Sequence, residues 1–353
     1  MTLLRQYAAT EAETRARRLA ALATGCLLDE VRLTPKPGLV DRRGSGAHQD
    51  LTLALMERSA HSLTPAFQAL ALACWQQPAD VALRQRVGQL GREAEACMLQ
   101  ATGGVNTHRG AIWALGLLVC GAAMTADSQD AVGSGAEALT LRGNAAALSG
   151  TAVVTWGANA APGTGAETAA RGATIAVGTG TAAATRRENA TICSGEQAMT
   201  RVVKAAARLA RLPDAQMPRQ FSNGQRASAR FRLPGAREEA QQGFPHITDL
   251  ALPQLHASRQ QGATEEQAQL DALLAMMTSL SDTCVLSRAG LAGLTAMQQG
   301  ARAVLAAGGV SQPAGWSALV QLDRQMLAAN ASPGGAADLL AATLFLDRLS
   351  RGG

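Results

Sequence analysis

The stretch TGGVNTHRGAIWALG, residues 102–116, places two adjacent glycines, an Asn, a His and an Arg directly before a smooth apolar run. The apolar run predicts a helix that is buried in the core. Glycines let a backbone approach a ligand closely, and the first turn of a helix offers unpaired N–H groups and the positive end of the helix dipole. The stretch therefore predicts an anion site at the start of a buried helix.

The residues before this stretch extend the same site. Glu95, Met98 and Thr102 are spaced i, i+3 and i+7, so they share one face of a helix that leads to the glycines. A plain alternative is a C-capping glycine followed by an N-cap, which explains Gly103 and one cap residue but not the whole cluster. We call residues 95–109 the second polar segment; its candidate site residues are Glu95, Gly103, Gly104, Asn106, His108 and Arg109.

Composition favours helices. Hydrophobic residues make up 47% of the 353 residues and aromatic residues only 3%, so the core is built from Ala, Leu and Val. The formal net charge of +5 is modest and no basic run is interleaved with aromatics, so we expect no nucleic-acid partner. With neither a secretory signal nor a long apolar run, the sequence predicts a cytoplasmic protein without a membrane anchor.

The chain has six cysteines, none of them spaced as CxxC. Most stand in apolar helical contexts, which favours buried, reduced thiols over a disulfide or zinc framework.

Helical periodicity covers most of the chain apart from one long segment. Residues 125–195 are rich in Ala, Gly, Thr and Ser and hold few large apolar side chains, so we expect a mostly disordered insertion. A small β-rich flap is the alternative. The remainder, residues 1–124 and 196–353, is predicted to be one all-α domain. The expected helices are 3–32, 51–75 with a bend near Pro65, 81–101, 108–124, 197–211, 226–232, 236–243, 264–280, 288–307, 314–330 and 335–350.

Three more polar segments stand at helix ends or breaks. The first polar segment is EVRLTPKPGLVDRRGSGAHQD, residues 30–50, the third is GAREEAQQGFPHI, residues 235–247, and the fourth joins residues 282–288 to residues 332–338. Two glycines in the first turn of a helix at 334–335 weaken it, so a neighbouring helix or a ligand must need the close approach. The candidate site residues of these segments are Lys36, Asp41, His48, Asp50, Arg237, Asp282, Arg288, Ser332, Gly334 and Gly335.

Glycine-rich helix starts, basic residues and carboxylates together predict a site for a phosphate-rich ligand with Mg²⁺. No P-loop or dinucleotide-binding glycine motif is present. The ordered blocks TPKPGLVD, TGGVNTH, GAREEAQQGFPHI, DTCVLSRAG and SPGGAADLLAATLFL resemble the triphosphoribosyl-dephospho-CoA synthase family. The resemblance covers residues from about 10 to 124 and from about 197 to 350, outside the expected insertion.

The resemblance implies transfer of the 5-triphosphoribosyl group of ATP to the 2′-hydroxyl of 3′-dephospho-CoA, with release of adenine. Asp41 and Asp50, with Glu95 or Asp282, would divide general base work and Mg²⁺ binding, and His48 or His108 would protonate adenine or orient a carboxylate. Asp50, Glu95 and Asp282 are the expected metal ligands. The other candidates would bind substrate, through the cations Lys36, Arg109, Arg237 and Arg288, the glycine pairs 103–104 and 334–335, Asn106 and Ser332.

Two departures from the family pattern stand in the fourth segment, where Cys284 and Ser287 replace an expected Asn and His. These departures put an essential role for that His in doubt. The third segment also has Glu238 where Gly is common.

The blocks AARLARLPD and GFPHI favour the malonate decarboxylase branch over citrate lyase. The product would then pass to a phosphoribosyl-dephospho-CoA transferase that serves the acyl-carrier subunit. A non-catalytic assembly factor that binds CoA or the acyl carrier is the rival hypothesis, and a homodimer stays open.

Overall fold

The computed structural model of the chain describes residues 2–126, 180–216 and 223–352, and this part is helical, with no strand. The predicted all-α class is confirmed. Residues 1–126 and 192–353 form one compact unit and residues 127–191 a second. Most of the expected insertion lies outside the described residues, as does the alternative β-rich flap. No helix in the described ranges is long and apolar enough to cross a membrane.

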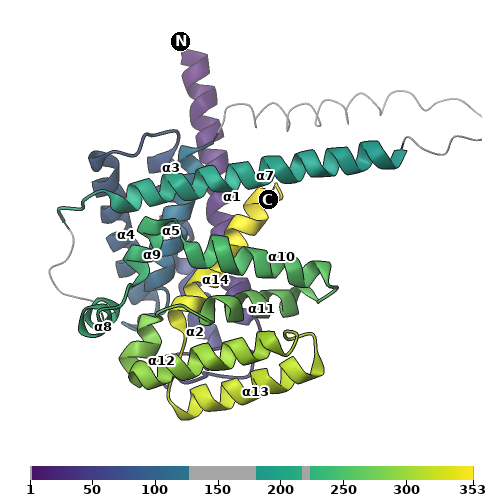
Figure 1. Cartoon of the computed structure of the whole chain (residues 1–353). Helices are drawn as coiled ribbons and strands as arrows, with labels where there is room; N and C mark the ends of the chain where they lie inside the picture. The colour runs from purple at the N-terminus through teal and green to yellow at the C-terminus, as the bar shows by residue number, and fades with distance from the viewer. Residues whose placement is uncertain (1, 127–179, 217–222, 353) are drawn as a thin grey trace, which may run out of the picture. The chain divides into compact units, whose positions relative to one another are not determined.

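Five helices precede the insertion (Figure 1). They are α1 (Thr2–Arg32), α2 (Leu53–Ser62), α3 (Thr64–Cys74), α4 (Val81–Ala101) and α5 (Arg109–Met124). The helix expected over 51–75 is in fact two, because Leu63 ends α2 and caps α3. Pro65 lies in the first turn of α3, where its missing N–H costs nothing. The proline therefore starts a helix instead of bending one.

The described elements after the insertion are more numerous. They are α7 (Gly180–Arg211), α8 (Asn223–Phe231), α9 (Ala236–Gln242), the π-helix η2 (His246–Ala251), α10 (Leu252–Gln260), α11 (Glu265–Met277), α12 (Thr283–Ala306), α13 (Pro313–Ala328) and α14 (Gly334–Ser350). Helix α7 begins earlier than expected. Neither η2 nor α10 was among the expected helices. Pro253 lies in the first turn of α10, a position that a proline tolerates.

Helix α5 lies at the centre of the described unit and packs against α14, α3 and α1. Its residues from Ala111 to Ala123 are buried almost without interruption. Small residues bring backbones close, since a Cβ on Gly121 would collide with the carbonyl oxygen of Val202 in α7. The predicted core of Ala, Leu and Val is confirmed. A first turn attached to this helix is therefore held rigidly.

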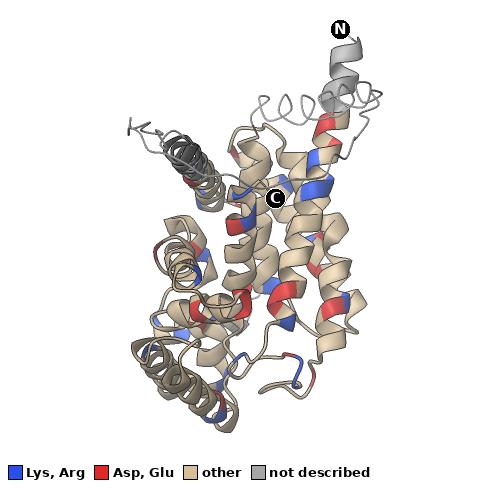
Figure 2. Ribbon diagram, turned by 90° about the vertical axis from the view of Figure 1, so that its right-hand side faces the viewer, with Lys and Arg blue, Asp and Glu red and all other residues tan. Residues whose placement is uncertain are grey.

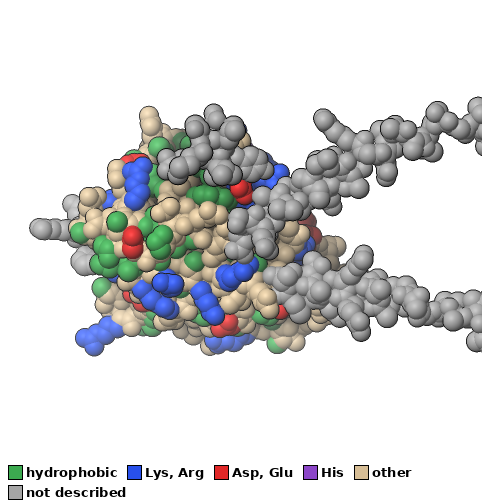
Figure 3. All heavy atoms as spheres, turned by 90° about the horizontal axis from the view of Figure 1, so that it is seen from above, with side chains coloured by type: hydrophobic (Ala, Val, Ile, Leu, Met, Phe, Trp, Pro, Cys, Tyr) green, Lys and Arg blue, Asp and Glu red, His purple; other side chains and the backbone are tan. Residues whose placement is uncertain are grey.

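Charged residues are sparse along the helices. Figure 2 shows long uncharged stretches of ribbon, with acidic and basic residues interspersed between them. Figure 3 shows Lys and Arg side chains next to apolar ones on the face seen from above. Among the described cysteines, Cys26, Cys74 and Cys120 are buried and none is in a disulfide. Buried thiols were expected, although Cys97 is exposed.

Candidate active site

A cleft of about 1460 Å³ is lined by residues from all four polar segments. Its walls come from the loop between α1 and α2, from α4 and α5, from α8 and α9, and from the first turns of α12 and α14. The predicted site residues that line it are Lys36, His48, Asp50, Glu95, Asn106, His108, Arg109, Arg237, Arg288, Ser332, Gly334 and Gly335. Asp41, Gly103, Gly104 and Asp282 are not among its lining residues.

A buried ion pair forms the floor of the first polar segment. The Nζ atom of Lys36 lies 2.5 Å from Oε1 of Glu30 and 2.6 Å from its carbonyl oxygen. Both side chains are almost fully buried. Burial raises the pKa of Glu30, and the charge of Lys36 opposes that rise. Lys36 is thus held by Glu30 and contributes a fixed positive charge to the cleft rather than a mobile phosphate contact.

Asp41 organises the loop instead of facing the cleft. One carboxylate oxygen accepts the backbone N–H of Lys36 at 2.9 Å and the other accepts that of Arg43 at 2.7 Å. The Arg43 guanidinium pairs with Asp41 at 2.8 Å and with Asp323 of α13 at 2.8 Å. These bonds occupy both oxygens of the Asp41 carboxylate and give it a structural task in the loop.

His48 joins the first segment to the fourth. Its Nε2 atom lies 2.8 Å from Oγ of Ser332, and its Nδ1 lies 3.7 Å from Oδ1 of Asp50, whose side chain is 65% exposed. Burial lowers the pKa of His48, as does Arg288, whereas Asp50 raises it. Ser332 directly precedes Pro333, the N-cap residue of α14, and its hydroxyl is bonded to the histidine.

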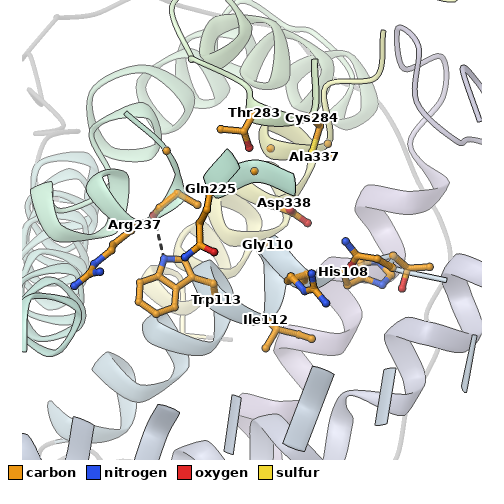
Figure 4. Close-up of a pocket in the computed structure, with 18 of the residues that line it drawn as sticks. His108, Gly110, Ile112, Trp113, Gln225, Arg237, Thr283, Cys284, Ala337 and Asp338 are labelled. Carbon is orange, nitrogen blue, oxygen red and sulfur yellow. Dashed lines mark hydrogen bonds between the residues drawn. The ribbon is translucent and has the colours of Figure 1, made fainter. Parts of the chain in front are cut away.

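His108 is the most enclosed group of the second segment. Its Nδ1 lies 2.8 Å from Oγ of Ser59, which in turn lies 2.5 Å from Oγ1 of Thr107. Its Nε2 is buried without a hydrogen-bond partner and the residue lines the cleft (Figure 4). Burial, together with the charge of Lys36, lowers the pKa of His108 to about 4. A neutral imidazole with one buried and unsatisfied nitrogen therefore stands in the lining of the cleft.

The glycine pair of the second segment has a different explanation. Gly103 and Gly104 have φ angles of 66° and 92° and follow the end of α4, where Gly104 N–H bonds to the carbonyl of Leu99. Helix α5 begins only at Arg109, so these glycines end a helix and do not begin one. The capping alternative thus accounts for both glycines. Arg109 and Glu95 pair across the two helices, with 3.0 Å between Nε and Oε2.

Asp282 fastens two helix starts together. One oxygen accepts the N–H groups of Cys284 and Val285 at the start of α12, and the other accepts that of Ala336 in α14 at 2.9 Å. A Cβ on Gly335 would lie 3.0 Å from this carboxylate. The two glycines are therefore needed for a neighbouring helix, one of the two expected reasons, and Asp282 is occupied by backbone groups and not open to a metal ion.

Asp338 is a half-buried residue that was not among the candidates chosen from the sequence. It lines the cleft from the first turns of α14, and a Cβ on Gly110 of α5 would collide with its Oδ2. Burial raises its pKa well above 3.8, and Glu30 and Asp282 add to the rise, while the Ala111 N–H opposes it. In the sequence, its position one turn after Gly334 and Gly335 was the feature that could have identified it as a site residue.

The predicted metal ligands do not form a protein cage. In the described ranges, no three His, Cys, Asp or Glu side chains gather closely enough to hold a metal ion. Asp50 and Glu95 line the cleft and Asp282 does not.

A second set of missed residues lines the side of the cleft formed by α4, α5, α8 and α9. Arg84 is buried in α4 and bonds to Asp214 at 3.4 Å, and Arg92 bonds to the same carboxylate at 2.9 Å. The guanidinium carbon of Arg84 lies 5.5 Å from the ring centroid of Trp113. In the sequence, the position of Arg84 within the apolar stripe of a helix was the feature that could have identified it as a site residue. Cations dominate this side, whereas buried carboxyls lie near the start of α14.

The model of the ATP:dephospho-CoA triphosphoribosyl transferase family matches residues 16–353. The chain belongs to this family. A 2-(5''-triphosphoribosyl)-3'-dephosphocoenzyme-A synthase of Klebsiella pneumoniae is 56% identical over 339 residues, which cover 96% of this chain and 97% of the relative.

A second relative agrees with the first. A probable 2-(5''-triphosphoribosyl)-3'-dephosphocoenzyme-A synthase of Stutzerimonas stutzeri (strain A1501) is 48% identical over 344 residues, covering 97% of this chain and 95% of the relative. No solved structure matches the chain. The supported activity is that of a triphosphoribosyl-dephospho-CoA synthase, a transferase with ATP and dephospho-CoA as substrates.

The two residues of the fourth polar segment that the sequence analysis gave as departures from the expected family pattern both lie at the cleft. Cys284 and Ser287 both line it, and the Ser287 hydroxyl donates to the carbonyl oxygen of Cys284 at 2.9 Å. Burial raises the pKa of the Cys284 thiol well above its usual value, with Asp282 and Asp338 nearby. A neutral thiol and a hydroxyl therefore face the cleft at these two positions.

Proposed function

We propose that this cleft holds ATP and 3′-dephospho-CoA together and transfers the triphosphoribosyl group to the 2′-hydroxyl. The observation that supports this most is the meeting of four distant polar segments around one cavity of about 1460 Å³. Pockets for a single small molecule typically measure about 300–1,000 Å³, so this cleft is large enough for two nucleotides. The mixture of cations, buried carboxyls and a neutral histidine supports a proton-exchanging transfer between polyanions.

The step exchanges one bond at the ribose. The bond from C1′ of the ATP ribose to N9 of adenine breaks, and a bond forms from the 2′-oxygen of dephospho-CoA to that carbon. Positive charge develops on the ring in an oxocarbenium-like transition state. The hydroxyl proton leaves to a base, and adenine takes up a proton as it departs. One group of the protein accepts the hydroxyl proton and another donates a proton to adenine, so the protons balance.

His108 and Asp338 are the two groups that match these tasks. The neutral imidazole has an unsatisfied Nε2 at the cleft, which would accept the hydroxyl proton. Ser59 holds the other ring nitrogen and so fixes the ring. Asp338 has a raised pKa, as a carboxylic acid needs if it is to donate a proton to adenine. This assignment differs from the expectation from the sequence, because His108 becomes the base in place of a carboxylate and Asp338 becomes the acid in place of a histidine.

The triphosphate would be bound by the cations of the cleft. Arg109, Arg237 and Arg288 line it, and Lys36 adds its buried charge from the floor. Arg288 also bonds to Ala47 and Asn330, so its guanidinium is held in place. Planar guanidinium groups suit paired contacts with phosphate oxygens. Asn106 and the N-terminus of α14, with its two glycines, would bind further oxygens.

The donor set also fits Mg²⁺, which is usually held by one or two carboxylates together with substrate phosphates. Asp50 and Glu95 would hold the ion, because both line the cleft, whereas both oxygens of Asp282 are bonded to backbone groups. When bound, the ion would neutralise charge on the triphosphate. Glu95 also pairs with Arg109, which would keep the carboxylate oriented.

The experiment is incubation of the protein with ATP, Mg²⁺ and dephospho-CoA, followed by chromatography for free adenine and mass analysis of the product. We expect adenine and the triphosphoribosyl adduct in equal amounts. Omission of either substrate is the control. Tight dephospho-CoA binding with no adenine release would favour the rival assembly factor and overturn the proposal.

We further propose that the product serves malonate decarboxylase rather than citrate lyase. The blocks AARLARLPD, residues 206–214, and GFPHI, residues 243–247, support this branch. The product would pass to a phosphoribosyl-dephospho-CoA transferase for the acyl-carrier subunit. The test is restoration of malonate decarboxylase activity, or of citrate lyase activity, in strains that lack their own synthase. Restoration of citrate lyase alone would reverse the assignment.

A further inference from the structure

Trp113 is set into the wall of the cleft in a single orientation. Its indole N–H donates to the carbonyl oxygen of Ala236 at the start of α9, at 3.0 Å. The Arg84 guanidinium lies over the ring, and Asp214 holds that arginine in turn. Figure 4 shows the indole at the cavity beside Ile112, Gln225 and Arg237. A ring fixed at its nitrogen and covered by a cation loses little freedom when a ligand stacks on it.

The chemical surroundings of Trp113 suit a purine ring. Apart from the two histidines, it is the only aromatic side chain among the described residues that line the cleft. Ile112, Gly116 and Leu117 of the same helix also line it, and Leu70 and Val87 add to this apolar wall from α3 and α4. A flat aromatic next to small and aliphatic groups provides the stacking surface that nucleobases use in proteins.

The position along α5 relates this surface to the reacting groups. Gly110, against which Asp338 packs, precedes Trp113 by three residues and shares its helix face. At 1.5 Å of rise per residue, the two positions are about 4.5 Å apart along the axis. A base stacked on Trp113 would thus lie about one helical turn from the Asp338 carboxyl. That arrangement matches a leaving base beside its proton donor.

We propose that Trp113 is the stacking platform for the adenine ring of ATP. The inference rests on the proposed function and names a positioning residue for the donor substrate. Dephospho-CoA also carries an adenine ring. The closeness of Trp113 to Asp338 assigns the platform to the base that must be protonated, which is the base of ATP.

The first test is binding, followed through tryptophan fluorescence. ATP is titrated without dephospho-CoA into the wild type, Trp113→Phe and Trp113→Leu. We expect ATP to quench the emission that the wild type has and Trp113→Phe lacks. Loss of a base stack weakens binding by about 5- to 150-fold, so the ATP Kd should rise by that factor in Trp113→Leu and little in Trp113→Phe.

The second test compares the change in KM for ATP with the change in KM for dephospho-CoA. Trp113→Leu should raise KM for ATP and leave KM for dephospho-CoA within about twofold of the wild type. Trp316→Phe is the matched control, since Trp316 is 44% exposed on α13 and does not line the cleft. A merely structural link between α5 and α9 would lower stability without selecting one substrate.

Three results would overturn the inference. They are a rise in KM for dephospho-CoA alone, unchanged constants for both substrates, and an active wild type whose Trp113 emission does not respond to ATP. The last of these results is obtained with the wild type, so it does not depend on whether Trp113→Leu folds. Failure of the wild type to release adenine would instead refute the proposed function, so the two failures are distinguishable.

Discussion

At the scale of single residues, the cleft shifts the pKa values of two titratable groups so that each favours its neutral form. Asp338 has a raised pKa and His108 a lowered one, and in each case burial is the main cause. Lys36 adds to the effect on His108, and Glu30 adds to the effect on Asp338. Groups held this way cost folding free energy, which is a common property of active sites.

Replacement of Asp338 by Asn should change the stability and the activity of the protein in opposite directions. A carboxyl with a raised folded-state pKa stays protonated while the unfolded chain ionises above the usual value near 3.8, so folding loses free energy as pH rises. Asp338→Asn should therefore raise the free energy of unfolding at pH 7. Without its proton donor, adenine release should fall by about 10²-fold or more.

Urea unfolding and the adenine assay measure the two effects on the same preparation. The amide oxygen of Asn can still accept the Ala111 N–H, which keeps the packing matched. An active variant with unchanged stability would remove Asp338 from the mechanism.

His108 gives the stability of the protein a defined pH dependence. Its pKa is about 4 in the folded state, against the ordinary histidine value of 6.5 in the unfolded chain, so only the unfolded chain binds the proton between these pH values. The stability contribution is complete above pH 6.5 and is lost as pH falls towards 4. Between pH 7.5 and pH 5, His108→Gln should lose about 2 kcal/mol less unfolding free energy than the wild type. Equal losses in urea titrations would contradict the assigned pKa.

At the scale of elements, the site depends on how closely α14 approaches its neighbours. Asp282 bonds to the first turns of both α12 and α14, and Gly335 leaves room for its carboxylate. Gly110 leaves room for Asp338 against α5. The same glycines that weaken the first turn of a helix therefore allow three helix starts to meet. The meeting point is where the proposed chemistry takes place.

Gly110→Ala should disturb this meeting point directly. The added methyl would collide with Oδ2 of Asp338, so the carboxyl must move or α5 and α14 must separate. Overpacking of this kind costs about 1–3 kcal/mol of stability, and adenine release should fall together with it. Gly25→Ala in α1 is the matched control, because nothing lies within 4 Å of its would-be Cβ. Thermal unfolding and the adenine assay of both variants check the prediction.

Many of the helices could be predicted from the sequence, because helical periodicity and glycine or proline breaks are local features of the chain. Most of the candidate site residues chosen from the sequence do line the cleft, although many other polar residues that line it were not chosen. Neither η2 nor α10 was predicted, since Pro253 reads equally as a breaker or as a first-turn residue. The sequence could not show that Asp41 and Asp282 accept backbone N–H groups, because only the fold brings those groups to the carboxylates.

At the scale of the whole molecule, the cleft draws on segments from both sides of the expected insertion. Its described lining begins at Glu30 and ends at Asp338, and none of it belongs to residues 125–195. The division of the chain into 1–124 with 196–353 and an insertion at 125–195 stays a prediction. It can be tested without any assumption about the conformation of that segment.

Replacement of residues 130–178 by a short Gly-Ser linker is that test. The segment holds few large apolar side chains, so its loss should remove little buried surface. We expect the shortened chain to keep its helical circular dichroism per residue and its rate of adenine release within about threefold, with linker length itself costing little. A matched variant with a longer linker controls for strain. Loss of activity in both would show that the segment takes part in function.

The order of the chain adds a consequence for biosynthesis. Of the described elements, α14 is the one that leaves the ribosome last, yet it supplies Asp338 and packs along α5 and α1 near the centre. Domains fold as units while chains are made from the N-terminus. A nascent chain that stops before α14 would lack Asp338, the group proposed to protonate adenine, and on that proposal it could not release adenine from ATP. The proposed site is therefore completed only when α14 packs against α5.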